Sequence, residues 1–414
     1  MQQKPSILLI HNTYLQKGGE DSVVAQELDC LQKEGYLVHS LFFNNSQKGI
    51  GSLLRYPFQL FFNLSAFVKV YRLVKKERIN IVHVHNYFYT ASPAVFWAAK
   101  MASAKTVMTL HNYRLFCLNG LLFYNNQPCT LCPDQQSFNP GIQRKCFKES
   151  GIFSRALAWS NRLHQQIETF TNKIDRFVVI NPLQEQLLLN KGIPANKIMY
   201  KPNFFNGFNH QAPPPFESRD DFYLYVGRLN PEKGIQELVQ AFKENGKKLR
   251  IVGDGPLADW VKSQIGTPTK SPTDNTNNST TGQITYTPAL PRESLAALYQ
   301  RCKALILPSR WYEGQPMTVI EAQSTGAIVI AADSPNMKRM VNHGINGFLY
   351  PLEPSHQLNE VISIFEARSV EANDGMSKAA YQQFLRSYTE EQHINALKLL
   401  YHFECSSKEH SNQP

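Results

Sequence analysis

Short apolar runs alternate with amphipathic stretches from the first residues to about residue 202. The runs have the length and composition of buried parallel strands, and the stretches between them space their apolar residues as one helix face does. The predicted strands are 7–11, 38–42, 81–85, 106–110 and 176–180, and the predicted helices are 20–34, 52–78 (one helix or a pair) and 93–100. This alternation predicts a parallel, doubly wound sheet with ligands at the carboxyl ends of its strands.

A second alternating series follows residue 220. Its predicted strands are 222–226, 249–252, 284–286, 304–307 and 327–331, with helices at 234–242, from Pro316 onward, and at 376–403. The Pro-rich stretch 203–220 is predicted to link two domains, 1–202 and 221–385. The Ser/Thr/Asn-rich stretch 267–282 is predicted to be a disordered loop, and 405–414 a flexible tail.

Length and charge narrow the class of protein. The chain has 414 residues, more than a single core usually holds, which supports two domains. The net charge of +10 favours an anionic partner, namely nucleotide phosphates, a polyanionic polymer or an acidic membrane surface. No signal peptide and no run of about 20 apolar residues is visible. We therefore expect a cytoplasmic protein, whose seven cysteines are reduced or bound to metal.

Two carboxylates, Glu313 and Glu321, lie eight residues apart between a predicted strand and a predicted helix. Pro316 suits the first helical position, so Glu313 is expected to precede the helix and Glu321 to lie more than one turn inside it. The free amides and the dipole at a helix start attract anions. The spacing predicts a diphosphate between the two acids, with a sugar hydroxyl at one end and a ribose at the other.

Glycines and a histidine follow two strands of the first half. Gly18 and Gly19 come after the first strand, where the backbone can approach a phosphate or a sugar, although a simple turn would also use glycine. His111 ends the strand 106–110 and is expected to face the ligand edge and to donate to a sugar hydroxyl or a developing charge. A structural histidine is the alternative.

Two cations, Arg228 and Lys233, lie five residues apart in a loop after the strand 222–226. Cations that converge before a helix suit a diphosphate. The alternative is a solvated pair of charges, which the flanking glycines Gly227 and Gly234 make less favourable.

A competing pattern, Gly253-x-Gly255-x-x-Ala258, fits a relaxed dinucleotide-binding fingerprint. The acid expected about 20 residues later would fall near Asp274, inside the low-complexity stretch, so a dehydrogenase is disfavoured. The sequence holds no Asp-x-Asp triplet either. We therefore expect donor binding without a metal.

Three motifs occur in order at familiar separations: Gly227-Arg-Leu…Lys233-Gly, Val252-Gly-Asp-Gly-Pro256 and Glu313-x7-Glu321-Ala-x3-Gly326. Together with Gly18-Gly19 and His111, they resemble the family 4 retaining glycosyltransferases of the GT-B fold over nearly the whole chain. The resemblance implies two Rossmann-like domains facing a central cleft, with a C-terminal helix, 386–403, that packs back onto the first domain. It also implies a nucleotide diphosphate sugar as co-substrate and no cofactor for catalysis.

The resemblance implies a role for each motif residue. Arg228 and Lys233 correspond to the clamp on the donor diphosphate. Glu321 corresponds to the ribose-binding acid, and Glu313 to the residue near the 3- and 4-hydroxyls of the donor hexose. Gly18 and Gly19 correspond to a loop that closes on the phosphates, and His111 to the histidine at the sugar 6-hydroxyl. The segment expected to meet the distal phosphate and the sugar through its backbone comprises Gln315, Pro316, Met317 and Thr318.

Four cysteines lie in one segment after His111: Cys117, Cys129, Cys132 and Cys146. Four thiolates can hold a structural zinc ion, but the outer spacings are long for a compact knuckle. The alternative is a loop with four reduced cysteines, partly buried as small apolar residues.

The region 52–78 places several apolar residues beside Arg55, Lys69, Arg72 and Lys76. Such a face suits an anionic membrane surface, although a core helix with a solvated basic side would look the same. The sequence as a whole predicts a retaining transfer of a hexose to a glycan or lipid-linked acceptor in cell-surface polysaccharide biosynthesis. Peripheral contact with the cytoplasmic membrane face is expected, and nucleic acid is not. A non-catalytic sugar-nucleotide-binding protein of the same fold is the alternative.

Overall fold

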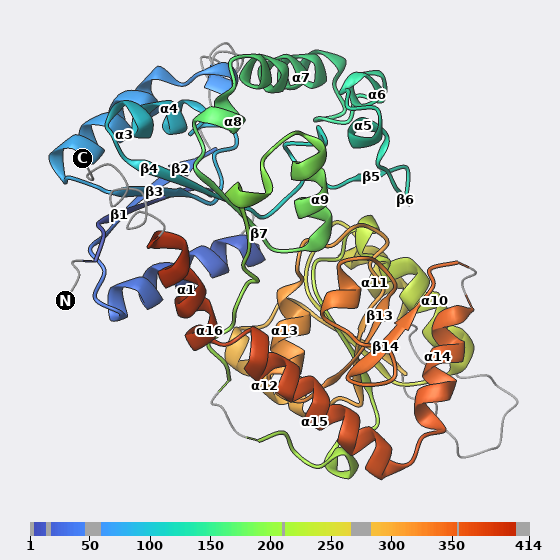
Figure 1. Cartoon of the computed structure of the whole chain (residues 1–414). Coiled ribbons are helices and arrows are strands. Elements are labelled where there is room, and N and C mark those ends of the chain that lie inside the picture. Colours follow the sequence, from blue (N-terminus) through green and yellow to red (C-terminus); the bar gives the residue numbers. More distant parts are fainter. Residues whose placement is uncertain are drawn as a thin grey trace, which may run out of the picture. The chain divides into compact units, whose positions relative to one another are not determined.

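The computed structural model describes residues 4–13, 18–45, 59–208, 212–265, 283–353 and 356–402. The predicted loop 267–282 and tail 405–414 lie outside the described residues. The chain divides into two compact units (Figure 1). Unit 1 comprises Met1–Leu122, Cys129–Phe204 and Glu390–Pro414, and unit 2 comprises Phe123–Pro128 and Phe205–Thr389.

Unit 1 is built on a six-stranded parallel sheet in the order β2-β1-β3-β4-β7-β8. Its strands are β1 Ile7–Thr13, β2 Val38–Asn44, β3 Ile81–Val84, β4 Lys105–Leu110, β7 Arg176–Val179 and β8 Ile198–Tyr200. The five predicted strands are confirmed within one or two residues at each end. The sequence did not reveal β8, because three residues are too few to show a periodic pattern.

The helices of unit 1 are α1 Gly19–Lys33, α3 Leu64–Lys76, α4 Ala94–Met101, α5 Leu131–Asp134, α6 Asn139–Gln143, α7 Gly151–Gln166, α8 Thr169–Asn172, α9 Pro182–Asn190 and α16 Glu390–Tyr401, with a 3-10 turn η1 at Ala195–Lys197. The predicted stretch 52–78 is not one continuous helix. The side chain of Asn63 accepts hydrogen bonds from the amides of Ser65 and Ala66 and so begins α3 at Leu64. Residues 52–58 lie outside the described part.

The C-terminal helix α16 belongs to unit 1 and lies against α1 (Figure 1). Its buried apolar side chains share one core cluster with Ile7 and Leu9 of β1: Ile394, Leu397, Leu400 and Tyr401. The preceding helix α15 ends at Ser387 and belongs to unit 2. The predicted helix 386–403 is thus interrupted at 388–389.

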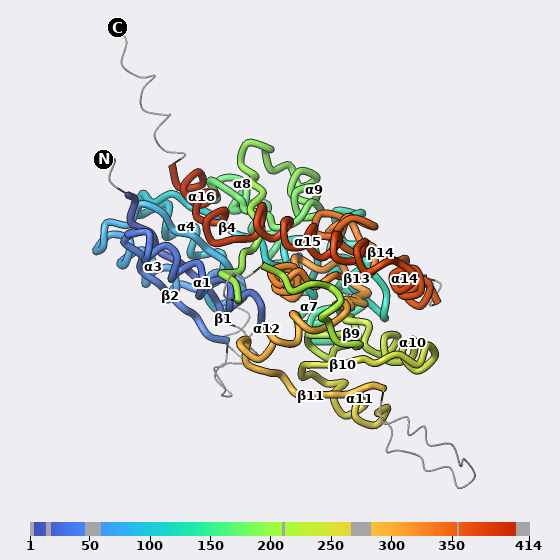
Figure 2. The backbone as a smooth tube through the Cα atoms, turned by 90° about the horizontal axis from the view of Figure 1, so that it is seen from below, coloured from blue at the N-terminus to red at the C-terminus, as the bar shows by residue number. Residues whose placement is uncertain are grey.

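Unit 2 has a second six-stranded parallel sheet, in the order β11-β10-β9-β12-β13-β14. Its strands are β9 Tyr223–Val226, β10 Leu249–Val252, β11 Ile284–Thr287, β12 Ala304–Leu307, β13 Ile328–Ala332 and β14 Gly347–Tyr350. Its helices are α10 Ile235–Asn245, α11 Ala258–Gln264, α12 Arg292–Arg301, α13 Met317–Gln323, α14 Gln357–Glu366 and α15 Val370–Ser387, with 3-10 turns η2 Phe216–Ser218, η3 Pro231–Lys233 and η4 Met337–Arg339. Figure 2 shows β9, β10 and β11 side by side, with α10 and α11 close to them. A two-stranded hairpin, β5 Phe123–Tyr124 and β6 Gln127–Pro128, also belongs to unit 2.

Alternation of side chains along β13 shows why both faces of this sheet are covered. Ile328 and Ile330 join a core cluster with α10 and α14, whereas Val329 and Ala331 join a cluster with α13 and α15. Successive residues of a strand point to opposite faces, so an uninterrupted apolar run buries both of them. The sheet of unit 2 is therefore doubly wound, as its strand pattern predicts.

The Pro-rich stretch 203–220 is packed where it is described. Phe204 lies in the core of unit 1 and Phe205 in a core of unit 2. The guanidinium of Arg219 donates to the carbonyls of Tyr299, Gln300, Cys302 and Thr325. Composition alone does not show these contacts, because they depend on residues about 80 or more positions further along the chain.

Candidate functional site

An ion pair joins the loops that leave the adjacent strands β9 and β12 of unit 2. Lys233 ends the 3-10 turn η3, and its Nζ lies 2.6 Å from Oε1 of Glu313. The hydroxyl of Ser309 donates to the same oxygen over 2.5 Å. Lys233 also lies over the ring of Trp311, 5.0 Å from its centre. The structure therefore brings together two of the predicted site residues, 80 positions apart in sequence.

The surroundings of Glu313 keep it ionised. Its side chain is buried, and burial alone would raise the pKa. The ammonium of Lys233 and the hydroxyl of Ser309 outweigh burial and hold the pKa of Glu313 below the usual 4.5. The side-chain amide of Asn336 donates to the backbone carbonyl of Glu313 and fixes the loop. Glu313 is thus a positioned acceptor, suited to a group that donates, such as a hydroxyl.

Glycines let the loops around this pair pack backbone to backbone. Gly253 has φ +150°, and a Cβ atom there would lie 1.8 Å from the carbonyl oxygen of Gly227. The amide of Leu229 donates to the carbonyl of Asp254 over 2.9 Å, which ties the same two loops together. Gly234 has φ +69°, and a Cβ atom there would lie 2.0 Å from the carbonyl oxygen of Pro308. The loop that carries the exposed Arg228 and half-buried Lys233 is therefore fixed on both sides.

This packing explains the Gly253-x-Gly255 pattern without a dinucleotide. A Cβ atom at Gly255 would lie 2.6 Å from the carbonyl oxygen of Leu229. Both glycines are thus required by the neighbouring loop, whereas in a dinucleotide fingerprint the second glycine lets the backbone approach a pyrophosphate. The structure gives the dehydrogenase alternative no support.

Glu321 lies inside α13 and is buried. The hydroxyl of Tyr299 donates to its Oε2 over 3.1 Å, and Arg292 lies 3.5 Å from its Oε1. Burial raises the pKa of Glu321 above 4.5, and Arg292 opposes this only in part. The carboxyl is thus held in place by a hydroxyl and a cation, and its remaining acceptor sites can take hydroxyl groups.

The start of α13 differs slightly from the prediction. Pro316 is the residue before the helix, and Met317 is the first helical residue, so Pro316 does not occupy the first helical position. Gln315 and Pro316 are buried, and Met317 and Thr318 are half-buried. The helix has only seven residues, so its dipole contributes little to an anion site. The cations Arg228 and Lys233 contribute more positive charge to such a site.

The predicted residues of unit 1 lie at the ends of β4 and α1. His111 directly follows β4, is half-buried, and has its Nε2 3.0 Å from Nδ1 of His85. Gly18 precedes α1, and its amide donates to Oδ2 of Asp21 over 2.8 Å. Gly18 has ordinary extended backbone angles, and a Cβ atom there would meet no atom of the described residues within 4 Å. The described part of its surroundings therefore does not require glycine at this position.

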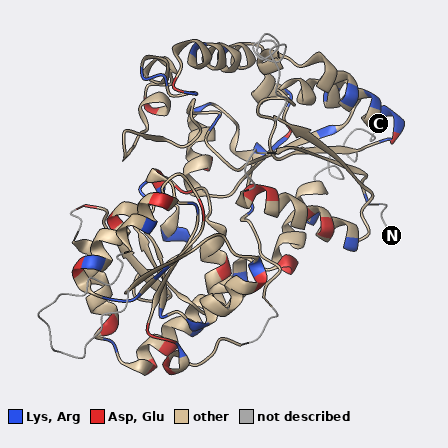
Figure 3. Ribbon diagram, turned by 180° about the vertical axis from the view of Figure 1, so that it is seen from behind, with Lys and Arg blue, Asp and Glu red and all other residues tan. Residues whose placement is uncertain are grey.

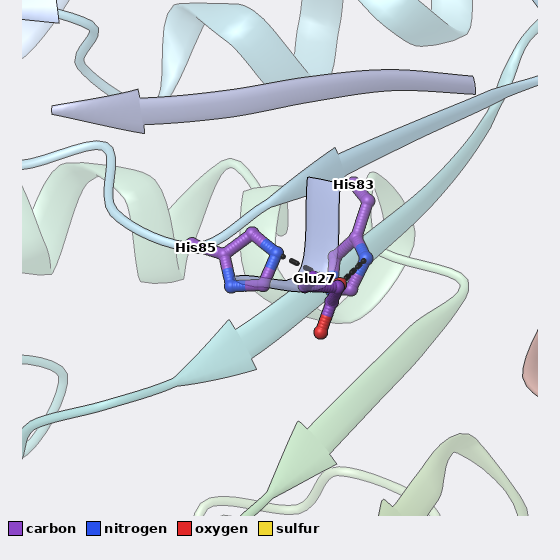
Figure 4. Close-up of side chains that lie close together, drawn as sticks. All are labelled: Glu27, His83 and His85. Atoms are coloured by element: carbon purple, nitrogen blue, oxygen red, sulfur yellow. Dashed lines mark hydrogen bonds and ion pairs between the residues drawn. The ribbon is translucent and has the colours of Figure 1, made fainter. Parts of the chain in front are cut away.

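A buried cluster in unit 1 gathers Glu27, His83 and His85 (Figure 4). Their ligand atoms lie within 4.8 Å of one another, close enough to test for a metal ion. Nζ of Lys201 already lies 3.0 Å from Oε2 of Glu27, and Nε2 of His393 lies 2.9 Å from it. The ammonium supplies the positive charge that a metal would bring, so the residues fit an ion-pair network better than a metal site.

The four predicted zinc ligands are separate thiols in the structure. Cys117 and Cys132 are buried, Cys129 and Cys146 are half-buried, and all four lie among the described residues. Within that described part, no three of these sulfur atoms lie within 4.8 Å of one another. Arg144 donates to the sulfur of Cys129 over 3.3 Å. Zinc binding stays a prediction, and the arrangement gives more support to four reduced cysteines.

Two family models match the chain. One is described as glycosyl transferases group 1 and matches residues 208–383, and the other as a glycosyl transferase 4-like domain and matches residues 25–203. The chain belongs to the group 1, family 4-like glycosyltransferases. The matches cover most of both units, including every motif residue named above except Gly18 and Gly19.

Relatives of this glycosyltransferase share modest identity over most of its length. An uncharacterised glycosyltransferase of Methanocaldococcus jannaschii is 21% identical over 362 residues, which cover 80% of this chain and 87% of the relative. The UDP-Gal:alpha-D-GlcNAc-diphosphoundecaprenol alpha-1,3-galactosyltransferase of Escherichia coli is 22% identical over 369 residues, covering 82% of this chain and 79% of the relative. Several other curated relatives align over about half of their own length.

A solved structure shows the same architecture. HepE of Anabaena, in complex with UDP and glucose, matches with a TM-score of 0.63 at 15% identity, covering 95% of this chain and 99% of that chain. Two parallel α/β units of this kind are the GT-B fold, which the glycosyltransferase has. None of the helices in the described ranges is both long enough and apolar enough to cross a membrane.

Several residues that contact the candidate site residues were not predicted from the sequence. Ser309 and Asn336 contact Glu313, and Tyr299 and Arg292 contact Glu321. Ser309 follows β12 closely, so its position at a strand end was a usable signal. His85 was equally visible, because it follows β3 as His111 follows β4. Tyr299 and Arg292 carry no such signal, since they lie on α12 among ordinary helix residues.

Proposed function

We propose that this glycosyltransferase transfers a hexose from a nucleotide diphosphate sugar to a glycan or lipid-linked acceptor, with retention at the anomeric carbon. The observation that carries the proposal is the contact between Lys233 and Glu313. It sets a cation beside an ionised, buried acceptor at the carboxyl ends of the adjacent strands β9 and β12. A sugar diphosphate is a ligand with these two needs, because its phosphates bind cations and its hydroxyls bind carboxylates.

The contacts support distinct roles for four residues of unit 2. Lys233 has three N–H donors and directs one toward Glu313, so others are available for phosphate oxygens. Arg228 is exposed on the same fixed loop and can add a planar, bidentate contact. Glu313 would accept the hydroxyls of the donor hexose. Glu321, with Tyr299 and Arg292 on either oxygen, would accept those of the ribose.

Further donor contacts are proposed for the backbone before and within α13 and for two places in unit 1. The backbone from Gln315 to Thr318 lies between Glu313 and Glu321 in sequence and would meet the distal phosphate and the sugar. In unit 1, Gly18 and Gly19 would contact the donor phosphates and His111 the sugar.

Retention with no carboxylate nucleophile requires the leaving phosphate to help deprotonate the acceptor on the same face of the sugar. The protein would then contribute positioning and stabilisation of charge on the diphosphate and the sugar ring. Lys233 and Arg228 supply positive charge without a metal ion, so we propose metal-independent donor binding. The test is the coupling constant of the new anomeric proton in the product, which reports whether the donor configuration is kept.

Two comparisons support a uridine donor and a lipid-linked acceptor as the first choices to test. The named donor of the E. coli relative is UDP-Gal and its named acceptor is alpha-D-GlcNAc-diphosphoundecaprenol, and the HepE structure holds UDP. Thermal shifts with UDP, GDP and ADP and their sugars would identify the base, because a ligand that binds only the folded state raises its stability. Cell-surface polysaccharide biosynthesis is the proposed setting.

The exposed face of α3 supports peripheral contact with an anionic membrane. Leu64 is exposed, and Lys69, Arg72 and Lys76 line the same groove beside Leu41 of β2. Figure 3 shows the basic residues of α3 in blue. Co-sedimentation with anionic vesicles at low salt tests the proposal: loss of binding in a variant with all three cations changed to Gln supports it, and no binding by the unmodified chain contradicts it.

Nucleotide release separates catalysis from mere binding. A glycosyltransferase is expected to release the nucleoside diphosphate quickly with acceptor and slowly without it. A non-catalytic sugar-nucleotide-binding protein would show the thermal shift but release no nucleotide under either condition.

A further inference from the structure

We infer that Glu27 and His85 are positioning residues that fix the tautomer of His111, with the proton on Nε2 and Nδ1 left as a hydrogen-bond acceptor. The part of the inference that concerns catalysis rests on the proposed function, in which His111 contacts the sugar. The tautomer itself depends only on contacts inside unit 1.

The three side chains form a line of two hydrogen bonds. Oε1 of Glu27, on α1, lies 3.1 Å from Nε2 of His85, which follows β3. Nδ1 of His85 lies 3.0 Å from Nε2 of His111, which follows β4. The two imidazole rings are stacked, with centres 5.3 Å apart. Figure 4 shows the ring of His85 turned toward Glu27, beside His83.

The acid at the head of the line is ionised. Burial of Glu27 raises its pKa, but Lys201 and the neighbouring imidazoles together lower the pKa well below 4.5. Nζ of Lys201 lies 3.4 Å from Nδ1 of His393, which must accept because an ammonium only donates. Nε2 of His393 lies 2.9 Å from Oε2 of Glu27, the same oxygen to which Lys201 donates over 3.0 Å.

The direction of each hydrogen bond follows from this acid. A carboxylate only accepts, so Nε2 of His85 must carry a proton. A neutral imidazole has one proton, so Nδ1 of His85 accepts the bond from Nε2 of His111. The proton of His111 is then on Nε2, and Nδ1 has a lone pair. This reverses the direction expected from the sequence, where His111 was predicted to donate.

The charges around the line favour the neutral rings. Lys201 already neutralises Glu27, so an imidazolium at position 85 would leave an uncompensated buried charge. Burial lowers the pKa of His85 and of His111, and nearby Lys201 acts in the same direction. Three further titratable groups face these rings. His83 of β3 lies beside His85, with ring centres 4.3 Å apart, and His393 of α16 and His11 of β1 also lie close; His11 bonds Asp21 over 2.9 Å.

Burial separates the roles of the three residues. Glu27 and His85 are 0% and 2% exposed, so they act on a substrate only through His111, which is half-buried. Because Nδ1 of His111 is unprotonated, it would accept a hydrogen bond from a sugar hydroxyl. Carboxylate and imidazole would hold the ring in that orientation and tautomer, as an outer carboxylate does for other functional histidines.

The direct test is NMR of the full chain labelled with ¹⁵N in histidine, with the His111 signals assigned by their loss in a His111→Gln variant. At pH 7 the nitrogen shifts are expected to show a protonated Nε2 and an unprotonated Nδ1 for His111. A protonated Nδ1 would overturn the inference, whatever the enzymatic activity. Because this measurement uses the unmodified chain, it does not depend on the folding of any other variant.

A matched pair of variants tests the role in catalysis. His85→Phe removes the partner of His111, whereas His83→Phe changes a neighbouring ring whose nitrogens contact Glu27, Thr109 and Tyr401. His85→Phe is expected to lose the single tautomer and to lower kcat about 100-fold with little change in donor KM, and His83→Phe to keep both. Equal kcat in folded His85→Phe and the unmodified enzyme would refute the positioning role. Absence of turnover in the unmodified enzyme would instead refute the proposed function.

Discussion

Lys233 and Glu313 meet at 2.6 Å although η3 and the loop after β12 lie far apart in the chain. The contact depends on β9 and β12 being neighbours in the sheet of unit 2. It places a cation and an anion within the reach of one ligand. If that ligand is a sugar diphosphate, the two residues should recognise different parts of it.

Binding measurements should separate these parts. Lys233→Ala is expected to weaken the binding of a nucleoside diphosphate by about 2 kcal/mol, or roughly 30-fold in Kd, because a charge-assisted hydrogen bond to phosphate is lost. Glu313→Ala is expected to weaken the binding of the nucleotide sugar more than the binding of the free nucleoside diphosphate. Isothermal titration with both ligands measures the difference, and Lys262→Ala, which breaks an exposed ion pair on α11, is the control. Equal losses for both ligands in Glu313→Ala would contradict its assignment to the sugar.

The glycine contact between two loops predicts a stability effect. Gly253→Ala places a Cβ atom 1.8 Å from the carbonyl oxygen of Gly227 at a φ of +150°, so it is expected to lower the free energy of unfolding by at least about 2 kcal/mol. Gly375→Ala, inside α15 with nothing within 4 Å, should instead raise it by about 0.5–1 kcal/mol. Denaturant unfolding of both variants measures these two changes in the free energy of unfolding. Unfolding midpoints that are similar in the two variants would contradict the prediction.

Glu321 predicts a dependence of stability on pH. Its folded-state pKa is raised above 4.5 by burial, so the folded protein holds this proton more tightly than the unfolded chain does. The stabilisation is present below pH 4.5 and is lost as the pH rises through the raised pKa. Glu321→Gln keeps an acceptor for Tyr299 and cannot ionise. As the pH rises from 4 to 7, the melting temperature of this variant should therefore increase relative to that of the unmodified protein.

The control for Glu321 is Glu293→Gln, at an exposed position of α12. If the difference in melting temperature between Glu321→Gln and the unmodified protein does not change with pH, Glu321 is not held as the structure indicates. The same Glu321→Gln variant should weaken nucleotide binding, because an amide is a poorer acceptor for ribose hydroxyls than a carboxylate.

Metal analysis decides between zinc and free thiols in the four-cysteine segment. Since no three of the sulfur atoms among these described residues converge, we expect less than about half an equivalent of zinc in protein purified without chelator. We also expect no loss of folding on chelation, and the same melting temperature in Cys129→Ser, whose side chain is only half-buried. One equivalent of zinc that Cys129→Ser abolishes would restore the zinc prediction.

The sequence predicted most of what local patterns determine. The strands of both sheets have apolar runs, and the residues at their ends, such as Lys233, Glu313 and His111, could be named as candidates. The partners of these residues could not be named, because they depend on which strands become neighbours. His85 meets His111 only because β3 pairs with β4, and Ser309 meets Lys233 through Glu313 only because β12 pairs with β9.

Burial was a second quantity that the sequence did not show. Glu27 and Lys201 read as ordinary charged residues, yet both are buried and paired in unit 1. Phe205 and Arg219 lie in a Pro-rich stretch that resembled a linker, yet both pack into unit 2. The cysteine spacings left zinc binding and four reduced thiols both open, because spacing alone does not show whether the sulfur atoms converge. In each case the missing information was three-dimensional.

The most direct test of the central claim is nucleoside diphosphate release from a nucleotide sugar in the presence of a lipid-linked acceptor. The unmodified protein is expected to release nucleotide with multiple turnovers, whereas folded Lys233→Ala and Glu313→Ala should release almost none, and Lys262→Ala should match the unmodified protein. Turnover in Lys233→Ala and Glu313→Ala equal to that of the unmodified protein would contradict the account.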